Sequence, residues 1–271
     1  MYYGDLLEKL LKKEQNPVNR MYLNEIKIKW GNFEKESENI ETSNEILINT
    51  FNEFLKKLNN KKFKFVKTSS KGFKPDSELF SPKYIDDLIS VIMQRKSILK
   101  HSGIVWGKQQ FTTGLQLNPS SFLDLQDTPN FEHGQSPELL VLTQHVNFQF
   151  KIAGKHRFNK YLINYPLIVF LTFRNLTQDD LIKSEYYATM AKKTFSKSKL
   201  IIVTEMLDTG IIHDIQTSLI DTIFVLRKQF VDDVLNPIST DILNALEQKI
   251  DNLLEERFDL TDNFIETGLI N

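Results

Sequence analysis

Hydrophobic residues recur every three or four positions near both ends of the chain, which is the pattern of helices that bury one face. This spacing predicts helices over residues 6–11 and 44–58, with a polar loop at 31–43 between them. Another helix is predicted from Ser81 onward, because serine caps helix starts and the proline that follows it suits the first helical position. A last helix is predicted over 237–257.

The middle of the chain contains short apolar or alternating runs that are typical of strands. Strands are predicted around 138–143 and 146–153, and the second of these alternates between apolar and polar residues. Two unbroken apolar runs, 167–173 and 200–203, flank a predicted helix over 179–195. A strand, a helix and a strand at this spacing form a crossover unit, in which two parallel strands are covered on both faces.

A further strand is predicted near 223–226. Together these elements predict an α/β (α+β) fold, in which a central mixed β-sheet is flanked by helices. By this interpretation the chain has an N-terminal helical and basic segment (1–74), an α/β core (75–230) and a C-terminal helical segment (231–271).

Composition excludes several classes of protein. The chain has 271 residues, of which 41% are hydrophobic and 25% charged, so it can bury a sizeable core. It has no cysteine, which excludes disulfides, a thiol nucleophile and cysteine-bound metals. No apolar run reaches the roughly 18–20 residues that cross a membrane, and the start lacks the pattern of a signal peptide. We therefore expect a cytoplasmic protein without membrane association.

Positive charge is concentrated in one segment, although the net charge is only −1. Residues 56–74 contain eight lysines and no acidic residue. Such a segment can contact the backbone phosphates of DNA, while the alternative is a solvated surface without a partner. The candidate DNA-binding residues are Lys61, Lys62, Lys64, Lys67, Lys71 and Lys74.

Several common catalytic motifs are absent. The sequence has no glycine-rich phosphate loop, no His-Glu-x-x-His and no Gly-x-Ser-x-Gly. Its five histidines are scattered and never have the spacing of metal ligands, so we interpret them as structural or surface residues.

Five short segments are notable for their order along the chain. They are Asn52–Leu55, Glu78–Pro82, Tyr165–Val169 leading into Asn175–Thr177, Leu200–Glu205 and Phe224–Gln229. In this order, and with these element types, they resemble the heterodimeric type II restriction endonucleases of the PD-(D/E)XK superfamily. The resemblance covers roughly residues 45–230. It implies a restriction-endonuclease-like core, double-stranded DNA as substrate, Mg²⁺ as cofactor and a second, non-identical subunit as partner.

In that superfamily an acid on one strand and an acid-x-Lys motif on the next hold Mg²⁺. The metal ion neutralises the phosphate and activates the attacking water. Aligned with this pattern, the first acid matches Glu138, whereas the acid-x-Lys positions fall on Leu171 and Phe173. Neither of these two side chains can bind a metal, so this registration predicts a degenerate subunit that binds DNA without cutting it.

A second registration keeps a catalytic set. Glu138 is followed after ten residues by a Gln-x-Lys variant, in which Gln149 and Lys151 would share one face of a strand. Glu138, Gln149 and Lys151 are therefore the candidate catalytic residues, and Glu138 is the candidate Mg²⁺ ligand. The alternative is an ordinary amphipathic strand with a polar outer face. Asp76 and Glu78 form a third candidate, although acids at a helix start also interact favourably with the helix dipole.

The sequence thus leaves more than one class of function open. The first is a subunit of a Mg²⁺-dependent type II restriction endonuclease, with or without a working active site. The second is a non-catalytic DNA-binding or regulatory protein on a nuclease-like scaffold. The third is an interaction protein whose lysines have no nucleic-acid role.

Overall fold

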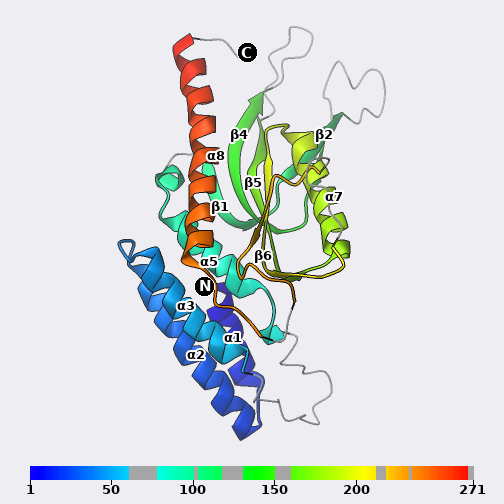
Figure 1. Cartoon of the computed structure of the whole chain (residues 1–271). Helices are drawn as coiled ribbons and strands as arrows, with labels where there is room; N and C mark the ends of the chain where they lie inside the picture. Colours follow the sequence, from blue (N-terminus) through cyan, green and yellow to red (C-terminus); the bar gives the residue numbers. More distant parts are fainter. Residues whose placement is uncertain are drawn as a thin grey trace. The chain divides into compact units, whose positions relative to one another are not determined.

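The computed structural model describes residues 1–60, 78–100, 103–117, 131–149, 160–211, 218–231 and 234–267. The chain forms two compact units (Figure 1): Met1–Arg95 with Phe224–Asn271, and Lys96–Ile223. The first unit thus joins the N- and C-terminal helical segments, which the order of the sequence keeps apart. Among the described residues, no helix combines the length and the apolar character that crossing a membrane requires.

The first unit is built from helices. They are α1 (Tyr2–Lys13), α2 (Pro17–Glu38), α3 (Asn44–Leu58), α5 (Lys83–Gln94) and α8 (Thr240–Thr267). An aromatic cluster forms much of the core, in which the Trp30 ring lies 5.0 Å from those of Tyr3 and Phe33 and 4.9 Å from that of Phe54. These rings are fully buried, so the cluster stabilises the packing of α1, α2 and α3.

The predicted loop at 31–43 is wrong in its first part, because α2 continues to Glu38. Its buried positions 30, 33 and 37 recur at helical spacing, but the charged residues between them hide this pattern in the sequence. The start of α2 is capped by Asn16, whose side chain accepts hydrogen bonds from two backbone N–H groups. The helix predicted over 44–58 is confirmed as α3, and Ser43 caps it.

The second unit is organised around a mixed sheet with the strand order β1-β4-β5-β6-β7. The strands are β1 (Ile104–Gln109), β4 (Leu139–Gln149), β5 (Lys160–Leu176), β6 (Lys199–Leu207) and β7 (Thr222–Val225). β4 pairs antiparallel with β1 and with β5, whereas β6 runs parallel to β5. A short 3₁₀ helix, η1 (Ser97–Lys100), precedes β1, and β2 (Thr112–Leu117) and β3 (Phe131–Gln135) form a separate two-stranded sheet. The predicted mixed α/β class is confirmed.

The crossover between the parallel strands is α7 (Gln178–Thr194). Its Leu181, Ala188 and Ala191 are buried in one cluster with Val169 of β5 and Ile202 of β6. The small alanine side chains allow the helix to approach the sheet closely. The strand, helix and strand predicted from the apolar runs are therefore confirmed.

The two strands predicted around 138–143 and 146–153 are a single strand. β4 runs without a break from Leu139 to Gln149, and only its register with β5 shifts between Leu142 and Thr143. The polar residues in its middle do not end the strand, because neither glycine nor proline interrupts it and β5 continues to bond to it. Residues 150–153 lie outside the described part of the chain.

Candidate functional site

The predicted catalytic residues lie far apart in the chain. Glu138 directly precedes β4 and its side chain is exposed, whereas Gln149 is the last residue of β4. The 11 residue-to-residue steps from Glu138 to Gln149 span roughly 36 Å of extended chain. The structure therefore does not bring Glu138 and Gln149 together. Lys151 lies outside the described residues, and its role stays a prediction.

The other predicted contacts also lie outside the part that the structure describes. These are Asp76 and the candidate DNA-binding residues Lys61, Lys62, Lys64, Lys67, Lys71 and Lys74. Glu78 lies in a short helical segment that precedes α5. Over the described residues, no three histidine, aspartate or glutamate side chains are grouped so that they could hold a metal ion.

The pairing of β4 with β5 shows what lies beside Glu138. Leu140 pairs with Phe170 and Val141 with Val169. Glu138 itself lies in a bend just before β4, and the same register, continued by two residues, would set it opposite position 172 of β5. The first registration, which aligns the acid-x-Lys motif with Leu171 and Phe173, expects Glu138 near this position. Its two motif positions lie on either side of residue 172.

Alternation along β5 turns neighbouring residues to opposite faces of the sheet. Leu171 is buried in the cluster that packs under α7, and Phe173 packs against the same cluster. Thr172 and Arg174 therefore face the other side of the sheet. Leucine and phenylalanine occupy these two motif positions because both belong to the hydrophobic core.

Glu138 lies in a bend directly before β4, and its neighbour Leu139 packs against the α7 cluster. The alternation of β4, continued by one residue, would place Glu138 on the opposite face, which is the face of Thr172 and Arg174 on β5. The two residues of β5 that correspond in facing to an acid-x-Lys motif are therefore Thr172 and Arg174. They lie one residue further along the strand than Leu171 and Phe173, which the first registration used.

The next strand adds a carboxylate to this face. Phe173 pairs with Thr204 and Asn175 with Met206, so Arg174 and Glu205 lie side by side on parallel strands. Glu205 is fully buried. A buried carboxylate needs a compensating charge or hydrogen bonds, and Arg174 is the basic residue at the neighbouring position of β5. We call Glu138, Thr172, Arg174 and Glu205 the polar cluster of the sheet.

The polar cluster does not suit Mg²⁺. A divalent ion requires several oxygen ligands with negative charge, but the position expected to carry the second acid has only the Thr172 hydroxyl. The guanidinium of Arg174 adds positive charge where a metal ion would bind. An arginine beside a threonine hydroxyl instead suits a phosphate anion, which accepts hydrogen bonds from both groups.

Sequence reasoning missed Thr172, Arg174 and Glu205. The only available signal was that Thr172 and Arg174 are polar residues in an otherwise apolar run. In a strand that is buried on both faces the sequence has no regular alternation, so the face of each residue could not be assigned.

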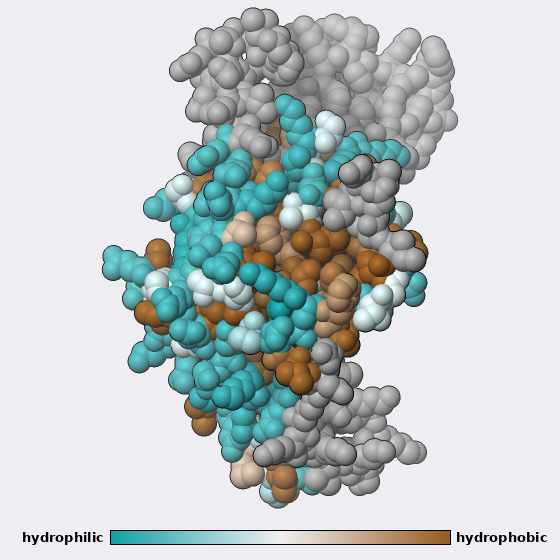
Figure 2. Space-filling model, viewed as in Figure 1, coloured by the Kyte–Doolittle hydropathy of each residue, from teal (hydrophilic) through white to brown (hydrophobic). Residues whose placement is uncertain are grey.

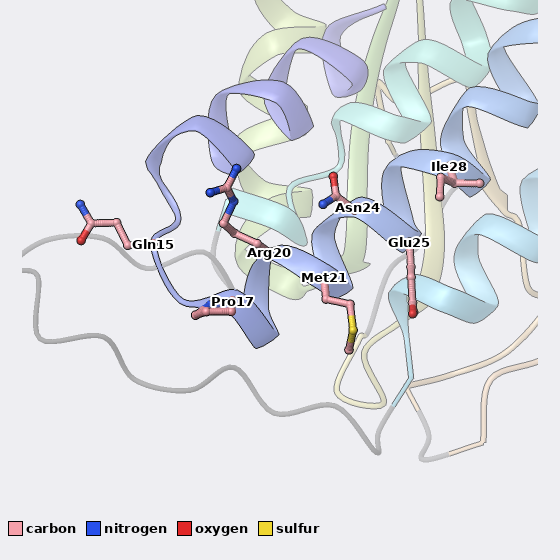
Figure 3. A pocket seen from close by; sticks show the side chains of 7 residues that line it. All are labelled: Gln15, Pro17, Arg20, Met21, Asn24, Glu25 and Ile28. Carbon is pink, nitrogen blue, oxygen red and sulfur yellow. The ribbon is translucent and has the colours of Figure 1, made fainter.

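The first unit has an open groove of about 480 Å³ along α2, shown in Figure 3. It is lined by Gln15, Pro17, Arg20, Met21, Asn24, Glu25 and Ile28. Met21 and Glu25 point to one side of the helix in this view, and Arg20 and Asn24 to the other. The groove contains no group of converging titratable side chains, so it lacks the features of a catalytic site.

A second groove in the same unit has a volume of about 680 Å³ and lies between α3 and residues 227–237. Its lining includes Lys56, Arg227 and Val234. Figure 2 shows hydrophilic side chains over much of the described surface in that view, with hydrophobic side chains exposed between them. Several apolar residues are more than half exposed, among them Met21, Ile28 and Val234.

Comparison with known proteins identifies the fold. No family model matches the sequence, and no curated protein matches it. Among solved structures, the native BbvCI A2B2 tetramer contains a similar chain, with a TM-score of 0.62 and 17% sequence identity. The similarity covers 93% of this chain and 96% of that chain. The protein therefore has a restriction-endonuclease-like fold over nearly its whole length.

Proposed function

We propose that this chain is the DNA-binding subunit of a type II restriction endonuclease, which cuts double-stranded DNA at a specific site together with a second, non-identical subunit. The observation that carries the proposal is the shared fold with BbvCI, a hetero-oligomeric type II restriction endonuclease. The similarity spans nearly the whole of both chains, so it extends beyond a core that many unrelated proteins share.

The need for two different chains follows from symmetry. A symmetric dimer presents the same surface to both half-sites and therefore reads palindromes. An asymmetric site calls for two different surfaces, and one subunit can then lose its metal ligands while it keeps its DNA contacts. The polar cluster, in which Thr172 and Arg174 lie beside Glu138, supports this assignment of a non-cutting role.

The proposal assigns Mg²⁺ and the cutting step to the partner subunit. This chain contributes phosphate contacts, for which the lysines between Lys61 and Lys74 are the candidates. Such contacts increase affinity and fix the position of the duplex, but they carry no sequence information. Arg174 would add one contact of the same kind at the polar cluster.

A nicking assay on supercoiled plasmid tests the proposal, with the chain alone and with its partner over a Mg²⁺ titration. We expect the chain alone to bind duplex DNA at low salt without nicking it. The assembled enzyme should cut in Mg²⁺ and lose all activity in EDTA. Glu138→Gln should leave cutting by the assembled enzyme unchanged.

Two results would overturn different parts of the proposal. Failure to bind duplex DNA at low salt, or specific cutting that survives in EDTA, would contradict the nuclease assignment as a whole. Nicking by the isolated chain that disappears in Glu138→Gln would contradict only the non-cutting role, and would show that this chain has an active site of its own.

The second candidate function is a non-catalytic DNA-binding or regulatory protein on the same scaffold. It is favoured by the poor fit of the polar cluster to a metal ion. It predicts salt-sensitive DNA binding that is independent of Mg²⁺, and no cutting with any partner. The same plasmid assay, performed with and without the partner, distinguishes the two candidates.

A further inference from the structure

The helices α1, α2 and α3 form a bundle in which each runs antiparallel to the next. Only three residues separate the end of α1 at Lys13 from the start of α2 at Pro17. The Tyr22 hydroxyl, near the start of α2, donates a hydrogen bond of 2.7 Å to the carbonyl of Lys57, which lies in the last turn of α3. The end of α1, the start of α2 and the end of α3 therefore lie together at one end of the bundle.

This packing separates the charges of the first 60 residues. We call residues 8–29 and 52–60 the basic end of the bundle, and residues 1–7 and 30–51 the acidic end. The basic end has eight basic and four acidic side chains, whereas the acidic end has one basic and six acidic side chains. Together the two ends are nearly neutral, so the amino-acid sequence hides a division that the antiparallel helices create.

All four acidic residues of the basic end already have partners within it. Three of them form ion pairs with lysines, namely Glu8 with Lys27, Glu25 with Lys57 and Glu53 with Lys29. The fourth, Glu14, is 2% exposed and accepts hydrogen bonds from the Asn16 backbone and the Asn19 side chain. The basic side chains beyond these ion pairs are all exposed, and they are Lys9, Lys12, Lys13, Arg20 and Lys56.

Helix dipoles explain only part of this positive charge. Lys12, Lys13 and Lys56 lie in the last turns of α1 and α3, where cations interact favourably with the dipole. Arg20 instead lies at the fourth position of α2, close to the positive end of that helix, and the first turn of α2 has no acidic residue. A cation at that place is unfavourable unless an anion compensates it. The position of Arg20 therefore favours an anionic partner.

The groove along α2 offers hydrogen-bond donors at the same end (Figure 3). It is lined by Arg20 together with the amides of Gln15 and Asn24. Arginine forms two parallel hydrogen bonds with a phosphate, and amide side chains also donate to phosphate oxygens. The one carboxylate in the lining, Glu25, is paired with Lys57, so it does not oppose an anion with an uncompensated charge.

We propose that the basic end of the bundle binds the phosphate backbone of duplex DNA, with Lys12, Lys13 and Arg20 in contact. The inference rests on the proposed function, because it requires that the chain binds DNA. It goes further by assigning backbone contacts to three described helices, in addition to the lysine-rich segment that follows α3 in the sequence. The duplex repels the acidic end, so only one end of the bundle can approach it.

Local charge removal tests the inference in the full chain. The variant Lys12→Gln/Lys13→Gln/Arg20→Gln removes three positive charges from exposed positions of the basic end. The matched control, Lys35→Gln/Lys183→Gln/Lys193→Gln, removes three exposed lysines elsewhere, one from the acidic end and two from α7. Both variants have the same net charge, so any difference between them reports the place of the charges. Circular dichroism and tryptophan fluorescence check that each variant is folded.

Binding is measured by fluorescence anisotropy on a duplex of about 30 base pairs, titrated over roughly 50–200 mM salt. The basic-end variant should bind at least about tenfold more weakly, and the slope of log affinity against log salt should decrease by about 2–3. The control should stay within about threefold of wild type. Acetylation footprinting with mass spectrometry should show that the duplex protects Lys12 and Lys13 but leaves Lys35 reactive.

The possible results separate this inference from the proposed function. If the wild-type chain binds DNA and the basic-end variant binds as tightly with the same salt slope, the inference is wrong and the proposed function stands. Equal weakening in both variants would also overturn it, because only total charge would then matter. Loss of assembly with the partner subunit at unchanged DNA affinity would show that the basic end is a subunit contact instead. If the wild-type chain does not bind DNA, the proposed function itself is wrong.

Discussion

Gln149 pairs with Lys160 at one end of β4, whereas Glu138 lies at the other end, 11 positions away. Because β4 is one continuous strand, these two ends belong to different parts of the sheet. At the Glu138 end Leu140 pairs with Phe170, and at the other end Gln149 pairs with Lys160. Glu138 and Gln149 could belong to one catalytic set only if β4 were interrupted between them. β4 has no such interruption.

The two faces of β5 predict unequal losses of stability when a negative charge is placed at neighbouring positions. Leu171→Asp should destabilise the protein by at least about 3 kcal/mol, because it places a carboxylate in the core under α7. Thr172→Asp should cost less than about 1 kcal/mol, because residue 172 is only half-buried and lies two positions from Arg174 on the same face of β5. Urea unfolding of both variants measures the difference. Equal destabilisation would contradict the assignment of the two faces.

Asp87 predicts a pH-dependent stability of the first unit. Its carboxylate accepts the backbone N–H groups of Tyr2 at 2.9 Å and Tyr3 at 2.8 Å, and thereby caps α1 from α5. Burial raises the pKa of Asp87 from 3.8 to about 6, against the lowering effect of these two hydrogen bonds. Between these two pKa values the folded state binds more protons than the unfolded state. The contribution of Asp87 to the free energy of unfolding is therefore fully present below the unfolded pKa, and it decreases as the pH rises through the folded pKa.

We therefore expect the free energy of unfolding to lose about 1–3 kcal/mol from Asp87 between about pH 4 and pH 7. Asp87→Asn, which stays neutral, should lack this loss. Relative to wild type, the variant should become steadily more favourable as pH increases over that range. The measurement is urea unfolding of both proteins at several pH values. A stability difference that does not change with pH would show that Asp87 titrates as in the unfolded chain.

Asp221 joins three groups of the second unit. Its carboxylate accepts the Leu200 backbone N–H at 2.9 Å, and it lies 2.9 Å from the Lys192 ammonium and 3.2 Å from that of Lys199. Asp221→Ala should cost about 1.5–3 kcal/mol, because it leaves the N–H group unsatisfied and removes both ion pairs. Asp221→Asn keeps an acceptor and should cost less. Thermal unfolding in low and high salt separates the charge effect from the hydrogen bond.

Thr177 forms a capping box at the start of α7. Its hydroxyl accepts the Asp180 backbone N–H at 3.2 Å, and the Asp180 carboxylate accepts the Thr177 backbone N–H at 3.2 Å. Thr177→Ala should lower stability by about 1 kcal/mol, whereas Thr177→Ser keeps the hydroxyl and most of the stability. Comparison of their unfolding midpoints checks this. Equal midpoints for the two variants would mean that the hydroxyl does not stabilise the helix.

The crossover unit was predictable because its signals are local. The apolar runs at 167–173 and 200–203 are long enough to be buried strands, and Thr177 with acids after it marks a helix start. The helix at 44–58 was equally clear, since six buried side chains recur on one face. By contrast α2 was missed, because charged residues alternate with its buried Trp30 and Phe33.

The candidate site was only partly predictable. Glu138 was identified from the resemblance to the family pattern, and the structure places it in a bend directly before β4. The partner positions were displaced by one residue, since nothing in the run from Leu167 to Phe173 shows which residues face α7. The extent of β4 and β5 pairing beyond β1 and β6 was also hidden, because it depends on contacts between strands that are distant in the sequence.

The amino-acid sequence alone therefore specified the local elements, from the spacing of apolar residues and the residues that cap helices. It also specified an acid-free basic stretch and the absence of cysteine chemistry. Only tertiary packing decided that Leu171 belongs to the core under α7 while Thr172 and Arg174 face the other side of the sheet. The physical reason is that a strand buried on both faces has no polar side to mark its orientation, so its facing is set by the helix and strands that pack against it.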